Sequence, residues 1–140
     1  MPANLTPYVP RLLVEWERDA PGADFRLIDG TLVFIDISGF TAMSERLARS
    51  GKVGAEEVTE VMNASFARLL DHAYHEGGSL LKFGGDALLL FYSGAGHAVR
   101  ACRAALAMRR GLRAFGRFRT SAGLVALRMS VGIHSGHNAL

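Results

Sequence analysis

The chain has 140 residues, of which 49% are hydrophobic and 21% charged, and its formal net charge is +3. This length fits one compact domain, and the composition is that of a globular protein, which excludes an intrinsically disordered chain. The longest apolar run, 87–92, is far shorter than the roughly 20 residues of a membrane helix. An export signal would have an apolar stretch near the N-terminus, but this sequence has Pro2, Pro7 and Pro10 there. We therefore expect a cytoplasmic protein without a membrane segment.

The chain has a single cysteine, Cys102, which excludes an internal disulfide, and we expect it to be a buried thiol.

Periodicity and turn residues divide the chain into elements. Apolar residues at helical spacing predict a docking helix or linker over 9–19, within an N-terminal segment formed by 1–26. The β-branched and apolar run 31–37 is typical of a strand that is buried on both faces. An apolar stripe predicts a long core-facing helix over 55–75. We also expect helices over 41–49 and 95–115, strands over 79–83 and 87–92 joined as a hairpin, and a final strand over 124–133.

With the two successive helices over 41–49 and 55–75 taken as one connection, the order of these elements from residue 31 onward is β-α-β-β-α-β. This order is typical of the ferredoxin-like, palm-like α+β fold. A right-handed crossover that skips one place puts the third strand antiparallel beside the first. Asp36 and Asp86 then become neighbours at one end of the sheet.

Asp36 and Asp86 each lie where an apolar strand meets a turn that contains glycine. A carboxylate in this setting is costly to desolvate unless a cation or hydrogen-bond donors meet it. Gly39, Gly84 and Gly85 leave backbone N–H groups that can approach phosphate closely. Two carboxylates beside phosphates are typical of sites that hold Mg²⁺ or Mn²⁺, and such a pair can hold two ions. The residues therefore predict a site for a nucleotide with divalent metal.

Three segments resemble the class III nucleotidyl cyclases: FIDISGFT at 34–41, KFGGD at 82–86 and RMSVGIHSG at 128–136. The resemblance implies a catalytic domain over 27–140. It implies that Asp36 and Asp86 are catalytic and hold two Mg²⁺ or Mn²⁺ ions, with the backbone of Ile37. It further implies that Lys82 reads the purine ring and favours ATP over GTP. The implied phosphate cradle consists of Ser38, Gly39, Phe40 and Thr41.

The resemblance also implies a reaction and an assembly. The ribose 3′-hydroxyl of ATP attacks the α-phosphorus, which releases pyrophosphate and closes 3′,5′-cyclic AMP. Members of the family are head-to-tail homodimers with sites at the interface, so Lys82 and Asp86 of one chain serve different sites. Cyclases continue after the third motif into an arm with an Asn and an Arg for the transition state, whereas this sequence ends at Leu140. We therefore expect slow turnover, and self-association or marginal stability, from this 140-residue chain.

Three other functions remain open. One is a catalytically impaired, cyclase-derived module for nucleotide binding or dimerisation. A diguanylate cyclase is less favoured, because Ala87 and Leu88 replace the Glu and Phe of its Gly-Gly-Asp-Glu-Phe turn. Nucleic-acid binding rests only on the arginines between 100 and 119, which also suit a solvated helix and its exit. In structural interpretations, Asp36 is a helix N-cap, Asp86 a turn residue and Lys82 a strand lysine.

Two pairs of histidines have weaker claims to function. His72 and His75 have a spacing that can hold a metal, but without a third ligand we expect solvated helix residues. His134 and His137 flank a glycine turn, where we expect structural roles.

Overall fold

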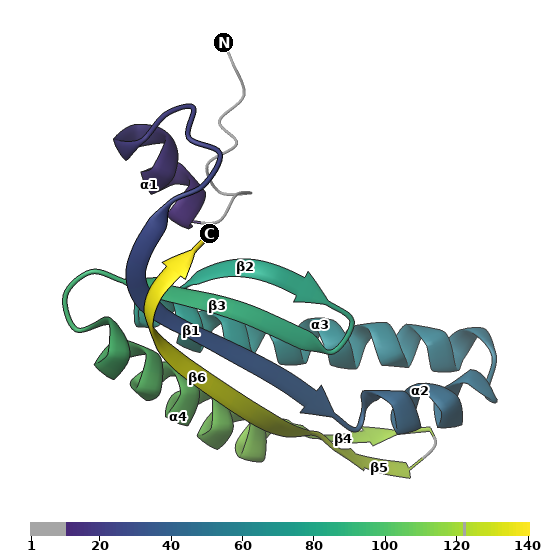
Figure 1. Cartoon of the computed structure of the whole chain (residues 1–140). Helices are drawn as coiled ribbons and strands as arrows, with labels where there is room; N and C mark the ends of the chain where they lie inside the picture. Colours follow the sequence, from purple (N-terminus) through teal and green to yellow (C-terminus); the bar gives the residue numbers. More distant parts are fainter. Residues whose placement is uncertain (1–10, 122) are drawn as a thin grey trace.

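The computed structural model describes residues 11–121 and 123–140 and shows a sheet packed on helices (Figure 1). The helices are α1 (Arg11–Asp19), α2 (Phe40–Ala48), α3 (Lys52–His75) and α4 (His97–Phe115). The strands are β1 (Leu27–Ser38), β2 (Ser79–Gly84), β3 (Ala87–Ser93), β4 (Arg117–Thr120), β5 (Gly123–Ala126) and β6 (Arg128–Ala139). Among the described residues, no helix is long and apolar enough to cross a membrane.

The main sheet has the strand order β2-β3-β1-β6, and every neighbouring pair is antiparallel. β1 and β3 pair over their length, with Gly30 opposite Ser93 at one end and Asp36 opposite Ala87 at the other. The predicted ferredoxin-like arrangement, with the third predicted strand beside the first, is therefore confirmed. Helices α3 and α4 lie together behind one face of this sheet (Figure 1).

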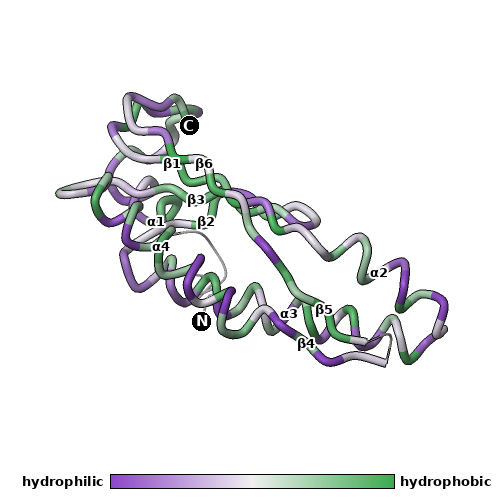
Figure 2. Tube along the Cα trace, turned by 90° about the horizontal axis from the view of Figure 1, so that it is seen from below, coloured by the Kyte–Doolittle hydropathy of each residue, from purple (hydrophilic) through white to green (hydrophobic). Residues whose placement is uncertain are grey.

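The core lies between that face and the two helices. Val33, Ile35 and Ile37 of β1 have no exposed surface, whereas Phe34 and Asp36 between them are exposed. The prediction that this strand is buried on both faces is therefore wrong, because α3 and α4 cover only one of them. The core stripe expected along α3 is confirmed by Val61, Phe66 and Leu69. Hydropathy along the trace alternates within the helices, as this one-sided packing requires (Figure 2).

The N-terminal helix α1 docks on the face of the sheet that α3 and α4 leave open, at the end of the sheet away from Asp36. The backbone N–H of Leu12 donates to Oγ of Ser79 at 3.0 Å, and Leu12 itself is buried. Leu13, the next apolar residue of this helix, is half exposed. The predicted helix is thus observed over 11–19, while positions 9 and 10 of the predicted element lie outside the described residues.

The predicted final strand over 124–133 is wrong. The chain instead forms a separate hairpin, β4–β5, and then enters β6, which runs on to Ala139. The N–H of Leu127 donates to the carbonyl of Gly116 at 2.8 Å, which closes the base of the hairpin. Leu127 is buried at this junction and separates two strands that a single apolar pattern had merged.

The expected helix α4 is confirmed, with its start at His97 because Gly96 adopts a left-handed conformation (φ 67°) that ends the preceding loop. Cys102 is exposed rather than buried, since the buried side of this helix is formed by its neighbours. These are Ala101, Ala104, Ala105, Met108 and Leu112.

Candidate active site

Asp36 and Asp86 meet at one end of the main sheet, as expected from the topology. Asp36 is paired with Ala87, the residue that follows Asp86, and the N–H of Ile37 donates to the carbonyl of Asp86 at 2.8 Å. Asp86 belongs to the two-residue loop between β2 and β3, in which Gly85 has a φ of 57°. A positive φ at the first loop residue suits glycine and is typical of a tight hairpin turn.

Both carboxylates are accessible and have no partner in the described part of the chain. Asp36 is exposed and Asp86 partly exposed, and neither side chain takes part in a hydrogen bond or ion pair among the described residues. The alternative role of Asp36 as a helix N-cap is wrong, because Gly39 occupies that position without a side-chain cap. The pair therefore presents hard oxygen ligands at the surface.

The turn after Asp36 leads directly into the N-terminus of α2. Gly39 has a φ of 106°, which other residues rarely adopt, and a Cβ there would lie 3.1 Å from the carbonyl oxygen of Ala126. The first N–H groups of a helix have no intrahelical partner, and here no side chain caps them. Phe40 anchors the turn, because its buried ring stacks on Phe66 at 5.7 Å between centroids. The turn thus offers N–H donors and a helix dipole to an anion.

Lys82 reaches the same face of the sheet as Asp36 because of a β-bulge. The pairing of β2 with β3 shifts between Leu80 and Lys82, so Lys82 lies opposite Leu89, which in turn pairs with Phe34. A regular register would put Leu81 opposite Leu89 and turn Lys82 toward the helices. Bulges often re-aim a side chain next to an active site. Lys82 is exposed and forms no ion pair with a described residue.

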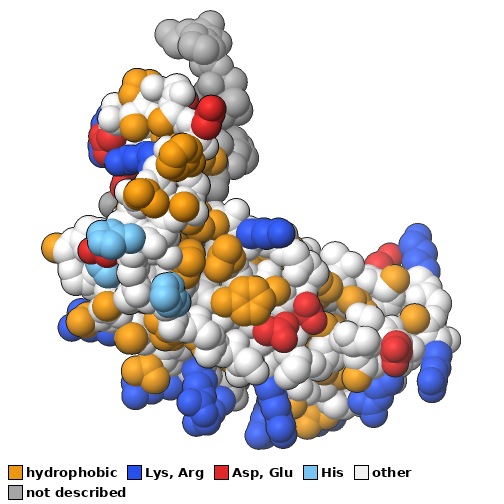
Figure 3. Space-filling view, in the orientation of Figure 1, with side chains coloured by type: hydrophobic (Ala, Val, Ile, Leu, Met, Phe, Trp, Pro, Cys, Tyr) orange, Lys and Arg blue, Asp and Glu red, His pale blue; other side chains and the backbone are white. Residues whose placement is uncertain are grey.

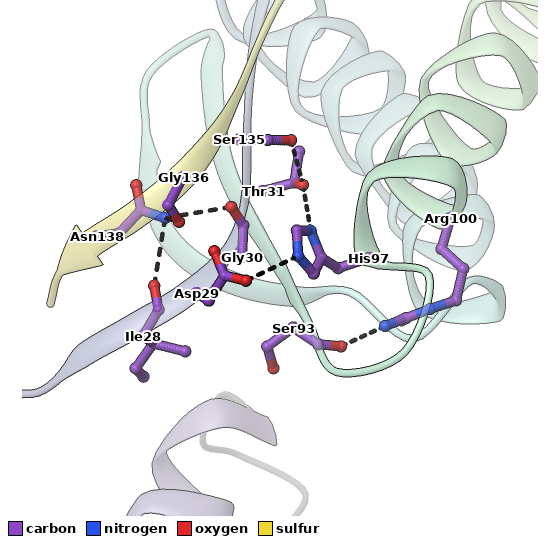
Figure 4. Close-up of polar contacts among 10 residues, drawn as sticks. All are labelled: Ile28, Asp29, Gly30, Thr31, Ser93, His97, Arg100, Ser135, Gly136 and Asn138. Atoms are coloured by element: carbon purple, nitrogen blue, oxygen red, sulfur yellow. Dashed lines mark hydrogen bonds and ion pairs between the residues drawn. The ribbon is translucent and has the colours of Figure 1, made fainter.

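A second polar cluster lies at the opposite end of β1 (Figure 4). The fully buried hydroxyl of Thr31 is 2.7 Å from Nδ1 of His97 and 2.7 Å from Oγ of Ser135. Nε2 of His97 lies 3.7 Å from a carboxylate oxygen of Asp29. This network ties the start of α4 to β1 and β6. Sequence reasoning missed it, although a Thr inside an apolar strand is a signal that its hydroxyl needs a buried partner.

The third sequence motif is divided between the two ends of the sheet. Ser130 pairs with Asp36, whereas Ser135 pairs with Thr31 in the second polar cluster. His134 and His137 are exposed, and His72 and His75 lie on α3. Within 11–121 and 123–140, no three His, Cys, Asp or Glu side chains form a group that could hold a metal ion. The two carboxylates alone still fit Mg²⁺, which is usually held by one or two carboxylates together with substrate phosphates.

Comparisons with known proteins agree with this geometry. The sequence model described as "Adenylate and Guanylate cyclase catalytic domain" matches residues 27–139. Adenylate cyclase type 10 of Homo sapiens is 36% identical over 93 residues, which cover 64% of this chain and 6% of that protein. Adenylate cyclase 1 of Rhizobium meliloti is 33% identical over 76% of this chain and 16% of its own. The chain therefore spans a small part of these relatives.

Solved structures give the same result. The adenylyl cyclase CyaB from P. aeruginosa superposes with a TM-score of 0.68 at 26% identity, over 84% of this chain and 60% of that one. The guanylyl cyclase Cya2 superposes with a TM-score of 0.66 at 30% identity, over 84% and 58%. The matched range includes both aspartates, the turn into α2 and Lys82. The chain therefore belongs to the adenylate and guanylate cyclase catalytic domain family.

Proposed function

We propose that this domain is an adenylate cyclase that converts ATP into 3′,5′-cyclic AMP and pyrophosphate. In this reaction the ribose 3′-oxygen bonds to the α-phosphorus, the bond from that phosphorus to the β-phosphate oxygen breaks, and the hydroxyl proton leaves to solvent. The observation that carries the proposal is the meeting of two unpaired carboxylates, Asp36 and Asp86, beside the uncapped N-terminus of α2.

Asp36, Asp86 and the backbone of Ile37 would hold Mg²⁺ or Mn²⁺. When bound, two such ions supply Lewis-acid stabilisation of the charge that develops on the phosphates. The chain's own part is to bind and orient the triphosphate. The N–H groups of the turn at Ser38 and Gly39, and of Phe40 and Thr41, would donate to phosphate oxygens, with the N-terminal dipole of α2 behind them.

The side chain of Lys82 favours ATP over GTP as the substrate. Its ammonium can donate only, so it suits N1 of adenine, which is an acceptor, and not N1 of guanine, which carries a hydrogen. The relatives include both adenylate and guanylyl cyclases, so the choice of purine rests on this side chain.

A head-to-tail homodimer would complete the site. The open face of the sheet carries the exposed side chain of Phe34 beside Asp36 and, two strands away, Lys82. Figure 3 shows exposed hydrophobic side chains on the middle of this face, with acidic groups next to them. In such a dimer, the aspartates of one subunit and Lys82 of the other subunit would bind the same nucleotide.

The metal site is tested by isosteric substitution. We expect Asp36→Asn and Asp86→Asn to weaken the binding of ATP with Mn²⁺, measured by calorimetry, by at least about tenfold, because each removes a charged oxygen ligand. Asp71→Asn, an exposed carboxylate on α3, is the matched control and should bind like the unaltered protein. Cyclic AMP formation should fall in the same two variants. Unchanged ATP–Mn²⁺ affinity in both would refute the assignment.

Purine selectivity is tested separately at Lys82. We expect Lys82→Glu to lower the ratio of ATP to GTP affinity by about tenfold, because a hydrogen bond to a charged group is worth about 1.5–3 kcal/mol. Lys52, the other lysine of the chain, is exposed at the start of α3, and Lys52→Glu should leave the ratio unchanged. Equal affinity of the unaltered protein for ATP and GTP would contradict the role of Lys82.

A further inference from the structure

A pocket of about 510 Å³ lies between the C-terminal part of α4, the β4–β5 hairpin and the start of β6. Four arginines line it: Arg109 and Arg113 of α4, Arg117 of β4 and Arg128 of β6. Its accessible apolar surface comes from Ala126 and Met129, while Leu112 and Leu127 behind them are almost fully buried. No acidic residue takes part in the lining.

These four guanidinium groups have no counter-charge within the described residues. The ion pairs there join Arg18 to Asp19 and His97 to Asp29, and none of the four arginine side chains forms a hydrogen bond among the described residues. Positions 1–10 and 122 contain no Asp or Glu that could serve instead. The positive charge of the pocket is therefore not neutralised by the chain itself.

The arrangement is unfavourable unless an anion shares it. Arg109 and Arg113 are four residues apart on α4, a spacing at which like charges destabilise a helix. The carbonyl end of the helix dipole offsets part of this cost, but only within its last turn. One guanidinium group can donate two hydrogen bonds to two oxygens of a phosphate. Four guanidinium groups around one cavity therefore suit a ligand with several phosphate oxygens.

We propose that this pocket binds a small molecule that carries two or more phosphate groups, without the divalent metal of the proposed cyclase site. The phosphates would lie on the arginines and the organic part on Ala126 and Met129. The volume is within the range of about 300–1,000 Å³ that is usual for small-molecule sites. A pocket of this size favours a small ligand over a nucleic-acid duplex, whose phosphates are usually bound by an extended basic patch or stripe.

Calorimetry in EDTA separates this pocket from a metal-dependent site. ADP and pyrophosphate are the probes, and we expect both to bind the unaltered protein without metal, with ADP the tighter. The double variant Arg113→Gln/Arg117→Gln should lose at least about tenfold in affinity for each. Arg103→Gln/Arg110→Gln removes the same charge from exposed positions of α4 outside the pocket, and should change affinity by no more than about twofold.

Asp86→Asn should bind both probes in EDTA as the unaltered protein does, because the pocket uses no carboxylate. All of the substituted arginines are exposed, so circular dichroism should show the same fold in every variant. The proposal is overturned if neither probe binds without metal at millimolar concentration, or if the two double variants lose affinity equally. It is also overturned if a DNA duplex binds through Arg113 and Arg117 while ADP and pyrophosphate do not.

Discussion

A single buried hydroxyl connects three distant parts of the chain. Thr31 of β1 contacts His97 at the start of α4 and Ser135 of β6, both at 2.7 Å. A threonine hydroxyl can donate one hydrogen bond and accept others, so it can serve both partners at once. Because Thr31 is fully buried, a water molecule cannot take the place of its hydroxyl in these hydrogen bonds. We infer that this residue fixes the position of α4 on the sheet.

We expect Thr31→Val to lower the free energy of unfolding by about 1–3 kcal/mol. Valine has nearly the same shape, but it removes the hydrogen bonds of the Thr31 hydroxyl to His97 and Ser135, and it leaves the largely buried ring of His97 without that partner. Urea unfolding would measure the loss of stability. Thr59→Val on the exposed surface of α3 is the matched control, with an expected change within about 0.5 kcal/mol. A loss no larger than that of the control would show that the cluster contributes nothing to stability.

At this scale, the sequence predicted residues whose signal is local and missed those whose role depends on distant partners. Asp36 and Asp86 stand at strand ends next to glycines, and the structure brings them together as expected. The partners of Thr31 are 66 and 104 positions away, so no local pattern marks them. Cys102 was misplaced for a related reason, because an alanine-rich helix gives little indication of which side faces the sheet.

Among the elements, the close packing of α2 on α3 depends on a glycine. A Cβ placed on Gly54 of α3 would overlap the carbonyl oxygen of Leu47 in α2. Gly54 is buried, and Leu47 lies in the core. Since α2 carries the N–H groups of the proposed phosphate turn at its other end, the spacing of the two helices also positions the site.

We therefore expect Gly54→Ala to destabilise the domain by about 1–3 kcal/mol, as is typical of overpacking. Without the close contact to Leu47, alanine would stabilise the helix relative to glycine by about 1 kcal/mol. A loss of stability in Gly54→Ala would therefore support the contact, and a gain would contradict it. Gly111→Ala on α4 is the comparison, because its Cβ would meet the side chains of His72 and Phe115, which can move. Thermal unfolding should rank Gly54→Ala well below Gly111→Ala, and the opposite order would contradict this account.

The elements themselves were predicted well in number and type up to α4, and less well after it. Glycine turns and long apolar stripes marked β1 to α4, which the structure confirms with shifts at the ends. The hairpin β4–β5 and the strand β6 were merged into one strand, since Leu127 continues the apolar pattern through the junction. The bulge before Lys82 was not predicted either, because a register shift is set by pairing with β3 and leaves no mark in composition.

For the molecule as a whole, the informative surface is the side of the sheet that α3 and α4 leave open. The apolar run in β1 had suggested burial on both faces, yet Phe34 on the open face remains 50% exposed in this single chain. Exposed apolar side chains beside polar ones are typical of interaction surfaces. A second copy of the chain, packed on this face, would account for the apolar character of the whole strand.

We expect the protein to form dimers through this face, and Phe34→Glu to shift it toward monomers in sedimentation equilibrium. The substitution places a charge where the proposed interface would bury an aromatic ring, at an energetic cost of several kcal/mol. It should not unfold the domain, because Phe34 lies outside the core. Leu106→Glu is matched to it, since Leu106 is 51% exposed on α4, in the layer behind the sheet. A monomeric unaltered protein would refute the dimer. Dimers that are lost in Leu106→Glu and kept in Phe34→Glu would place the interface on α4 and separate Lys82 from the aspartates of a partner.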